Sequence, residues 1–164
     1  MKISILIPVY NEKNTIISLL KKVNFQKSNH DLEIIVSDDG SKDGTLEVLK
    51  ENNTLYDQLI TNDQNAGKGN AIIKGLEFCN GSYTLIQDAD LEYDPEDYKK
   101  LFKPAYDNKA DAVYGSRFMG DEPRRILYFS HRVANFIITI LVSIFTNINF
   151  SDVETCYKLV KTDL

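Results

Sequence analysis

The 164-residue sequence is poor in cysteine and carries no excess of positive charge. Its two cysteines, Cys79 and Cys156, lie far apart and form no CxxC pair, which excludes a disulfide framework and a structural zinc site. Acidic side chains outnumber basic ones, 24 to 19, for a formal net charge of −5. This balance argues against a basic nucleic-acid-binding surface. We therefore expect no nucleic acid among the partners, and an enzyme or a small-molecule-binding domain fits better.

Targeting and linker features are also missing. Residues 1–9 run straight into strand-like sequence, without the basic start and small-residue cleavage site of a signal peptide. No internal repeat or low-complexity tract divides the chain. With 43% hydrophobic and 26% charged residues, the composition predicts one folded domain over residues 1–164. The rarity of cysteine favours a reducing compartment, so we expect the cytosol or the cytosolic side of a membrane.

Short β-branched and aliphatic runs alternate with segments of helical periodicity. Strands are predicted at 3–9, 32–36, 55–60, 83–86, 111–114 and 153–160. Helices are predicted at 16–23, 45–49, 71–78 and 97–106. This alternation favours an α/β fold with an open, mostly parallel sheet, flanked by helices in right-handed crossovers.

Polar and acidic residues collect where three of the predicted strands end, at 10–12, 38–41 and 88–90. In open parallel sheets, ligands bind outside the carboxyl ends of the strands. The three segments are therefore expected to converge on one cleft.

The triplet Asp88-Ala89-Asp90 directly follows the fourth predicted strand. Two carboxylates at a strand end can hold a hard divalent cation together with substrate phosphates, and Mg²⁺ or Mn²⁺ suits such oxygen ligands. A phosphatase with an aspartyl nucleophile would carry this pattern after the first strand instead. The plainer alternative is that Asp90 begins a turn and caps the next helix, since an Asp-x-Asp triplet alone is not specific.

Asp39 lies in the acidic strand end at 38–41. A carboxylate there can accept a hydrogen bond from the ring N–H of uracil or guanine, while the alternative is a simple turn at Asp39-Gly40. Lys68 stands in the glycine loop at 65–70 and can approach the phosphates of a ligand. That loop lacks the glycine spacing and the Lys-Ser or Lys-Thr ending of a P-loop.

A long apolar segment covers residues 133–150, which carry no charge. A membrane-spanning helix needs about 20 mostly apolar residues, and here Asn135, Thr139 and Ser143 interrupt the run at intervals of four residues. That spacing places the three on one side of a helix. We predict a helix with a narrow polar stripe that lies in a core or against a membrane and does not cross it.

Six motifs occur in order along nearly the whole chain, at 7–12, 35–45, 65–70, 88–92, 114–118 and 152–158. Together they resemble the family 2 inverting glycosyltransferases of GT-A fold, and within these the dolichol-phosphate mannosyltransferase and polyprenyl-phosphate glycosyltransferase branch. The resemblance implies a Rossmann-like GT-A domain. It also implies metal-dependent transfer of a hexose from a UDP- or GDP-linked donor to a polyprenyl (dolichyl or undecaprenyl) phosphate.

The resemblance also assigns donor-side roles residue by residue. Asp88 and Asp90 match the metal and diphosphate motif, which implies Mg²⁺ or Mn²⁺, and Glu92 stands near the metal where relatives often have glutamine. The residues expected to bind the donor nucleotide and its phosphates are Pro8, Tyr10, Glu12, Asp39, Lys68 and Ala89.

On the acceptor side, Arg117 matches an arginine that faces the lipid phosphate, and Arg132 is the second candidate. Arginine suits this role because it is always charged and binds phosphate with a fork of donors. Asp152 is the candidate base or orienting group, which completes a catalytic set with Asp88, Asp90 and Arg117. The alternative for the arginines is a solvated surface cluster, which would equally suit anionic lipid headgroups.

The chain departs from the family pattern by stopping soon after Asp152, so we expect a C-terminally truncated catalytic domain. The expected location is peripheral, on the cytosolic face of a membrane. Three alternatives stay open: transfer to a glycan or other soluble acceptor, sugar-phosphate nucleotidylyltransfer, and a non-catalytic nucleotide-sugar-binding module. Nucleotidylyltransfer would need a glycine- and arginine-rich loop after the first strand, where this chain has residues 8–12.

Overall fold

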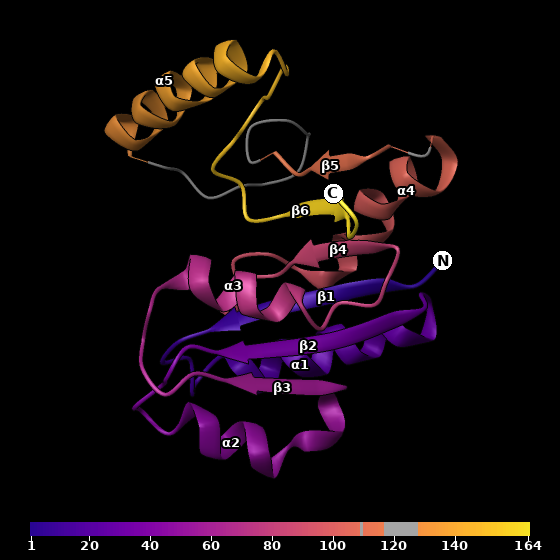
Figure 1. Cartoon of the computed structure of the whole chain (residues 1–164), viewed down its shortest axis with the longest axis vertical. Helices are drawn as coiled ribbons and strands as arrows, with labels where there is room; N and C mark the ends of the chain where they lie inside the picture. Colours follow the sequence, from indigo (N-terminus) through magenta and orange to yellow (C-terminus); the bar gives the residue numbers. More distant parts are fainter. Residues whose placement is uncertain (109, 117–127) are drawn as a thin grey trace.

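The computed structural model describes residues 1–108, 110–116 and 128–164, which form one six-stranded sheet flanked by helices (Figure 1). The strands are β1 (Ile3–Val9), β2 (Leu32–Asp38), β3 (Gln58–Thr61), β4 (Tyr83–Ile86), β5 (Ala112–Tyr114) and β6 (Lys158–Lys161). The α-helices are α1 (Ile16–Phe25), α2 (Thr45–Glu51), α3 (Lys68–Leu76), α4 (Tyr98–Asn108) and α5 (Phe129–Thr146). Short 3-10 helices lie at η1 (Gln26–Ser28), η2 (Asn53–Leu55) and η3 (Pro95–Asp97).

The strand order is β3-β2-β1-β4-β6-β5. β1 pairs in parallel with β2 and β4, and β2 with β3, while β6 runs antiparallel to both of its neighbours. The expected mostly parallel α/β sheet is confirmed. Parallel pairing brings Val9 level with Asp38 at the carboxyl edge, so the loops that follow these strands begin side by side.

Four of the predicted strands differ in extent from those observed: β2 continues to Asp38, β5 begins at Ala112, and the third and the last differ more. The third begins at Gln58 and not at residue 55, because η2 (Asn53–Leu55) turns the chain back toward the sheet after α2. The last covers only β6 (Lys158–Lys161), because residues 153–157 leave the sheet to contact the carboxyl end of β4. The glycine-loop helix α3 also begins three residues earlier than predicted, at Lys68.

The main core lies on one face of the sheet. Ile3, Ile5 and Ile7 of β1 are fully buried and belong to one apolar cluster with side chains of α1 and α4. Residues of a strand that differ by two point to the same face, so Leu6 points to the opposite face, where α3 packs. There a Cβ on Gly75 would lie 2.3 Å from Leu6 Cδ1. A larger residue at position 75 would therefore require the Leu6 side chain to shift.

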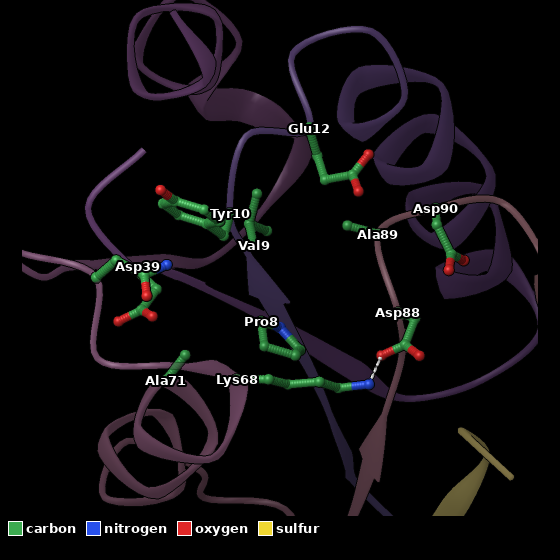
Figure 2. A pocket seen from close by; sticks show the side chains of 11 residues that line it. Pro8, Val9, Tyr10, Glu12, Asp39, Lys68, Ala71, Asp88, Ala89 and Asp90 are labelled. Carbon is green, nitrogen blue, oxygen red and sulfur yellow. Dashed lines mark ion pairs between the residues drawn. The ribbon is translucent and has the colours of Figure 1, made fainter. Parts of the chain in front are cut away.

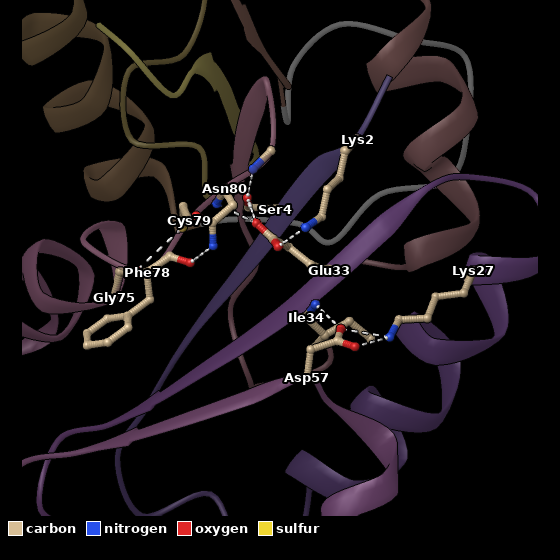
Figure 3. A network of polar contacts seen from close by, with 11 residues as sticks. Lys2, Ser4, Lys27, Glu33, Ile34, Asp57, Gly75, Phe78, Cys79 and Asn80 are labelled. Carbon is tan, nitrogen blue, oxygen red and sulfur yellow. Dashed lines mark hydrogen bonds and ion pairs between the residues drawn. The ribbon is translucent and has the colours of Figure 1, made fainter.

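Charged residues at the amino-terminal edge of the sheet form ion pairs and hydrogen bonds that stabilise the fold (Figure 3). Glu33 forms an ion pair with Lys2 and accepts hydrogen bonds from Ser4 Oγ and the Asn80 N–H. Burial alone would raise the pKa of Glu33, but these hydrogen bonds lower it below its usual value. Asp57 pairs with Lys27 and accepts from the Ile34 N–H. Glu33 and Asp57 therefore both bind structural partners.

The apolar helix α5 (Phe129–Thr146) lies at one end of the molecule, apart from the parallel strands (Figure 1). Asn135 and Thr139 are its buried residues, and most of its large apolar side chains are exposed. Burial in a core, one of the two predicted environments, is therefore wrong. By length and composition, α5 is the one helix in the described part of the chain that could cross a membrane.

Candidate functional site

A cavity of about 280 Å³ opens at the carboxyl ends of β1, β2 and β4 (Figure 2). It brings together eight residues that the sequence predicts for the site: Pro8, Tyr10, Glu12, Asp39, Lys68, Asp88, Ala89 and Asp90. Val9, Asn65 and Ala71 complete its lining. The expectation that three strand ends converge on one cleft is confirmed, because the parallel strands all end at the same edge.

Hydrogen bonds join the loop after β1 to the loop after β2. The Asn11 N–H donates to Ser41 Oγ at 2.9 Å, and the Lys42 N–H donates to Asn11 Oδ1 at 2.8 Å. The Glu12 N–H donates to Thr45 Oγ1 at 2.9 Å, and this bond ties the loop after β1 to the first residue of α2. Asn11 has a φ of 56°, a left-handed conformation that asparagine tolerates. These bonds hold Tyr10 and Glu12 at the mouth of the cavity.

Asp39 organises the glycine loop. Its buried carboxylate accepts from Asn62 Nδ2 at 2.6 Å, from the Ala66 N–H at 3.0 Å and from the Gly67 N–H at 2.7 Å. A carboxylate has about four acceptor positions, so these three donors leave room for one more. The turn alternative explains Gly40, whose φ is 71°, but it does not explain a buried carboxylate with three donors. Recognition of a base by Asp39 stays a prediction.

Asn62 supports the site through Asp39, although it does not line the cavity, and the sequence does not predict it. It is buried and directly follows β3, where it donates to Asp39 and to Asn70 Oδ1 and accepts from Lys74 Nζ at 2.8 Å. The rule that polar residues at strand ends form the site would have found it. No acidic motif marks it, and the predicted third strand ends two residues before it, at residue 60.

The Asp88 and Asp90 carboxylates differ in their surroundings. Asp88 is partly buried and forms an ion pair with Lys68, toward which its carboxylate points (Figure 2). Burial alone would lower the pKa of Lys68, but the bond to Asp88 raises it above its usual value, so the ammonium stays charged. Asp90 is exposed, and its Oδ1 accepts from the Glu92 N–H at 3.0 Å. Asp90 therefore starts the turn, as the alternative predicts, but Asp94 caps the next helix, η3, so that part of the alternative is wrong. The Asp90 side chain also lines the cavity.

The donor set fits a hard divalent cation that shares its coordination with a phosphate. Mg²⁺ and Mn²⁺ are bound by one or two carboxylates plus substrate oxygens more often than by complete protein cages. Within residues 1–108, 110–116 and 128–164, no three histidine, cysteine or carboxylate groups come together as a ready metal site. Glu92 does not line the cavity, and its role as a metal ligand stays a prediction.

Two of the predicted acceptor-side residues, Asp152 and Arg132, lie outside the lining of this cavity. Asp152 is buried and accepts from Asn135 Nδ2 at 2.9 Å, so α5 holds it. Arg132 is exposed in the first turn of α5. Arg117, with the neighbouring Arg124 and Arg125, falls outside the described residues. The roles of Asp152, Arg132 and Arg117 stay predictions.

The similarity to known proteins covers all six strands of the sheet. The sequence profile described as glycosyl transferase family 2 matches residues 4–163. A dolichol-phosphate mannosyltransferase of Pyrococcus furiosus is 33% identical over 120 residues, which are 73% of this chain and 34% of that enzyme. The chain thus spans about a third of that relative's length.

Two solved structures share the fold. A mannosyltransferase from Pyrobaculum calidifontis, in complex with GDP-Man and Mn²⁺, superposes with a TM-score of 0.61 at 26% identity, over 70% of this chain and 35% of that one. Glucosyl-3-phosphoglycerate synthase from Mycobacterium tuberculosis, in complex with Mn²⁺, UDP and glucosyl-3-phosphoglycerate, gives a TM-score of 0.72 at 20% identity. That likeness covers 99% of this chain and 57% of the other. The expected GT-A fold is confirmed, and the chain belongs to glycosyl transferase family 2.

Proposed function

We propose that this chain is a metal-dependent inverting glycosyltransferase that moves a hexose from a nucleotide-diphosphate sugar to a polyprenyl phosphate at a membrane surface. The observation that carries the proposal is the cavity itself. It joins a carboxylate pair, Asp88 and Asp90, to a charged lysine, Lys68, and to the buried Asp39, all at the carboxyl edge of the sheet. The P. furiosus relative supports a dolichol-phosphate acceptor, and the P. calidifontis structure supports a GDP-linked donor with Mn²⁺.

The donor would lie across the cavity with its base toward Asp39 and its diphosphate toward Lys68. Tyr10 is 43% exposed at the mouth of the cavity, so its ring is available to stack on a base. The remaining acceptor position of Asp39 suits a ring N–H, which uracil and guanine both offer. These contacts select a class of donor but not one base or sugar.

Asp88 and Asp90 would hold the divalent cation together with the diphosphate oxygens. When bound, such a cation stabilises the charge that builds on the leaving nucleoside diphosphate. Lys68 adds a second positive charge on the same side, since its ammonium already lies against Asp88. The protein thus concentrates positive charge where the leaving group becomes anionic.

A phosphate acceptor is already ionised near neutral pH, so transfer to it needs no strong general base. The requirement is instead for cations that hold the acceptor, and we assign this role to Arg117 and Arg132. Asp152, held by α5, would orient the acceptor or serve as the base. The apolar surface of α5 would lie on the bilayer, which places the acceptor side of the domain against the membrane and makes the protein peripheral on the cytosolic face.

The test is transfer from radiolabelled GDP- and UDP-sugars to dolichyl or undecaprenyl phosphate in vesicles, with Mn²⁺, with Mg²⁺ and with chelator. We expect a lipid-linked product that requires metal. Asp90→Asn should abolish product formation and metal-dependent nucleotide binding, whereas the matched control Asp97→Asn, a partly buried aspartate paired with Lys100, should change neither.

Other outcomes would redirect the proposal. Product on a soluble glycan without lipid, unaffected by Arg117→Ala, would identify a soluble acceptor. Metal-dependent nucleotide binding without turnover on any acceptor would identify a nucleotide-sugar-binding module. Absence of any nucleotide binding would overturn the assignment of the cavity to the donor.

A further inference from the structure

Gln87 is a fully buried polar residue between β4 and the Asp88-Ala89-Asp90 triplet, and neither composition nor motif singles it out. Its side-chain Oε1 accepts from two tyrosine hydroxyls, Tyr98 at 2.9 Å and Tyr157 at 3.0 Å. Its Nε2 donates to the carbonyl oxygen of Asp88 at 3.0 Å. The amide orientation is fixed by the Asp88 carbonyl oxygen, because that oxygen can only accept and must face the Nε2 group, which leaves Oε1 to the two hydroxyls.

The other side of Asp88 is held as well. The Asp88 N–H donates to Cys156 Sγ at 3.2 Å, and the Cys156 N–H donates to Tyr93 Oη at 3.2 Å. Asp88 is thus bound at its carbonyl oxygen by the neighbouring Gln87, and at its N–H by Cys156, a residue distant in the sequence. Its side chain is left to face the cavity and Lys68.

Both tyrosine hydroxyls donate a hydrogen bond to Gln87 Oε1. Tyr98 is fully buried and Tyr157 nearly so, and burial raises the pKa of both hydroxyls. Both hydroxyls are therefore protonated at neutral pH. Two O–H donors polarise the Gln87 amide, which strengthens the bond that its Nε2 makes to Asp88 in a buried environment.

We infer that Gln87, with Tyr98 and Tyr157, forms a positioning network that fixes Asp88 for metal and diphosphate binding. The inference rests on the proposed function, since it assumes that Asp88 holds the cation. Residues that orient metal ligands through hydrogen bonds typically contribute 10- to 100-fold to metal affinity. None of the three lines the cavity, so they are positioning residues and not catalytic ones.

The test compares three tyrosine-to-phenylalanine variants. Tyr98→Phe and Tyr157→Phe each remove one donor from Gln87. Tyr83→Phe is the matched control, because Tyr83 is also buried, as the first residue of β4. Its hydroxyl donates a bond of 2.9 Å, but to the Ala110 carbonyl oxygen and not to Gln87. All three lose one buried hydroxyl contact, so general destabilisation should be similar.

The readout is the Mn²⁺ concentration that half-saturates nucleotide binding, measured by calorimetry or by the electron paramagnetic resonance of free Mn²⁺. We expect this concentration to rise about threefold for each of Tyr98→Phe and Tyr157→Phe and about tenfold for the double variant, and to stay unchanged for Tyr83→Phe. Gln87→Met, which removes the donor to Asp88 itself, should raise it by roughly tenfold.

Two results would overturn the inference, and they are distinguishable. Mn²⁺-dependent nucleotide binding in the parent protein, with equal behaviour of all three tyrosine variants, would refute the positioning role alone. A parent protein that binds no nucleotide with Mn²⁺ would refute both this role and the proposed function. Circular dichroism on each variant separates either result from a loss of fold.

Discussion

Helices α1 and α5 bury opposite kinds of side chain. α1 places Ile16, Leu19, Leu20 and Val23 in the core and turns its lysines to water. α5 buries Asn135 and Thr139 and exposes most of its large apolar residues. The hydrophobic effect explains the first helix, because burial removes apolar surface from water. It does not explain the second.

Hydrogen bonds explain the orientation of α5. Asn135 Nδ2 donates to the buried Asp152, Thr139 Oγ1 accepts from the Val153 N–H at 3.3 Å, and Ser143 Oγ accepts from the Phe150 N–H at 3.3 Å. The polar stripe therefore ties α5 to the segment that follows it. An apolar surface of this size on a protein surface marks a contact with a partner or a membrane, which is why we place α5 on the bilayer.

The largest expected effect comes from replacing one apolar residue by alanine on each of the two helices and comparing the losses in stability. Leu19→Ala should lower the free energy of unfolding by about 3 kcal/mol, because Leu19 is fully buried and leaves a cavity. Ile144→Ala should change it by less than about 0.5 kcal/mol, since Ile144 is 70% exposed. Urea denaturation measures both. Equal losses would show that α5 is buried in solution.

Membrane binding should depend on α5 and not on exposed apolar residues elsewhere. Replacing Phe136, Ile140 and Ile144 by serine should weaken partitioning to anionic vesicles by about 2 kcal/mol, or roughly 30-fold, because three apolar side chains leave the bilayer interface. The control replaces the equally apolar and exposed Phe25, Ile73 and Leu76 by serine. Vesicle sedimentation would contradict the proposed surface if both triple variants behaved alike.

The polar stripe should contribute measurably to stability. Asn135→Ala removes a donor from the buried Asp152 and an acceptor from the Thr139 hydroxyl, so we expect a loss of about 1.5 kcal/mol in urea denaturation. Ser130→Ala, at an exposed position of the same helix, is the control and should change stability by less than about 0.5 kcal/mol. If the two variants matched, the stripe would not be what holds α5.

The smallest expected change in stability concerns an ion pair on the solvent side of α1. Its Lys22 pairs with Asp94 at 2.7 Å and lowers the pKa of that carboxyl group. A lowered carboxyl pKa stabilises the fold above the unfolded value of about 3.9, and this contribution is lost as pH falls through the folded value. Both side chains are about half exposed, so Lys22→Gln should cost only about 0.5 kcal/mol at pH 7. The difference from the parent should vanish once the pH is below the lowered pKa of Asp94 in the folded protein, and persistence in that acid range would contradict the assignment.

Much of the site can be predicted from the sequence, because the ends of the buried strands can be recognised in it. The buried run Ile3–Val9 and the acidic segments at 38–41 and 88–90 predicted one cleft, and the cavity lining confirms it. Asn62 and Gln87 were not predicted, since their roles depend on partners at distant positions such as Asp39 and Tyr157. No local pattern encodes such pairs.

The sequence by itself determined the alternation of strands and helices, the acidic strand ends and the polar stripe of α5. Each of these is a property of neighbouring residues and of the repeat of a strand or a helix. Only the tertiary structure decided which side of α5 faces inward and which donors hold Asp39 and Asp88. The physical reason is that a buried carboxylate or carbonyl must find a hydrogen-bond donor, and which donor is available depends on how segments far apart in the chain pack together.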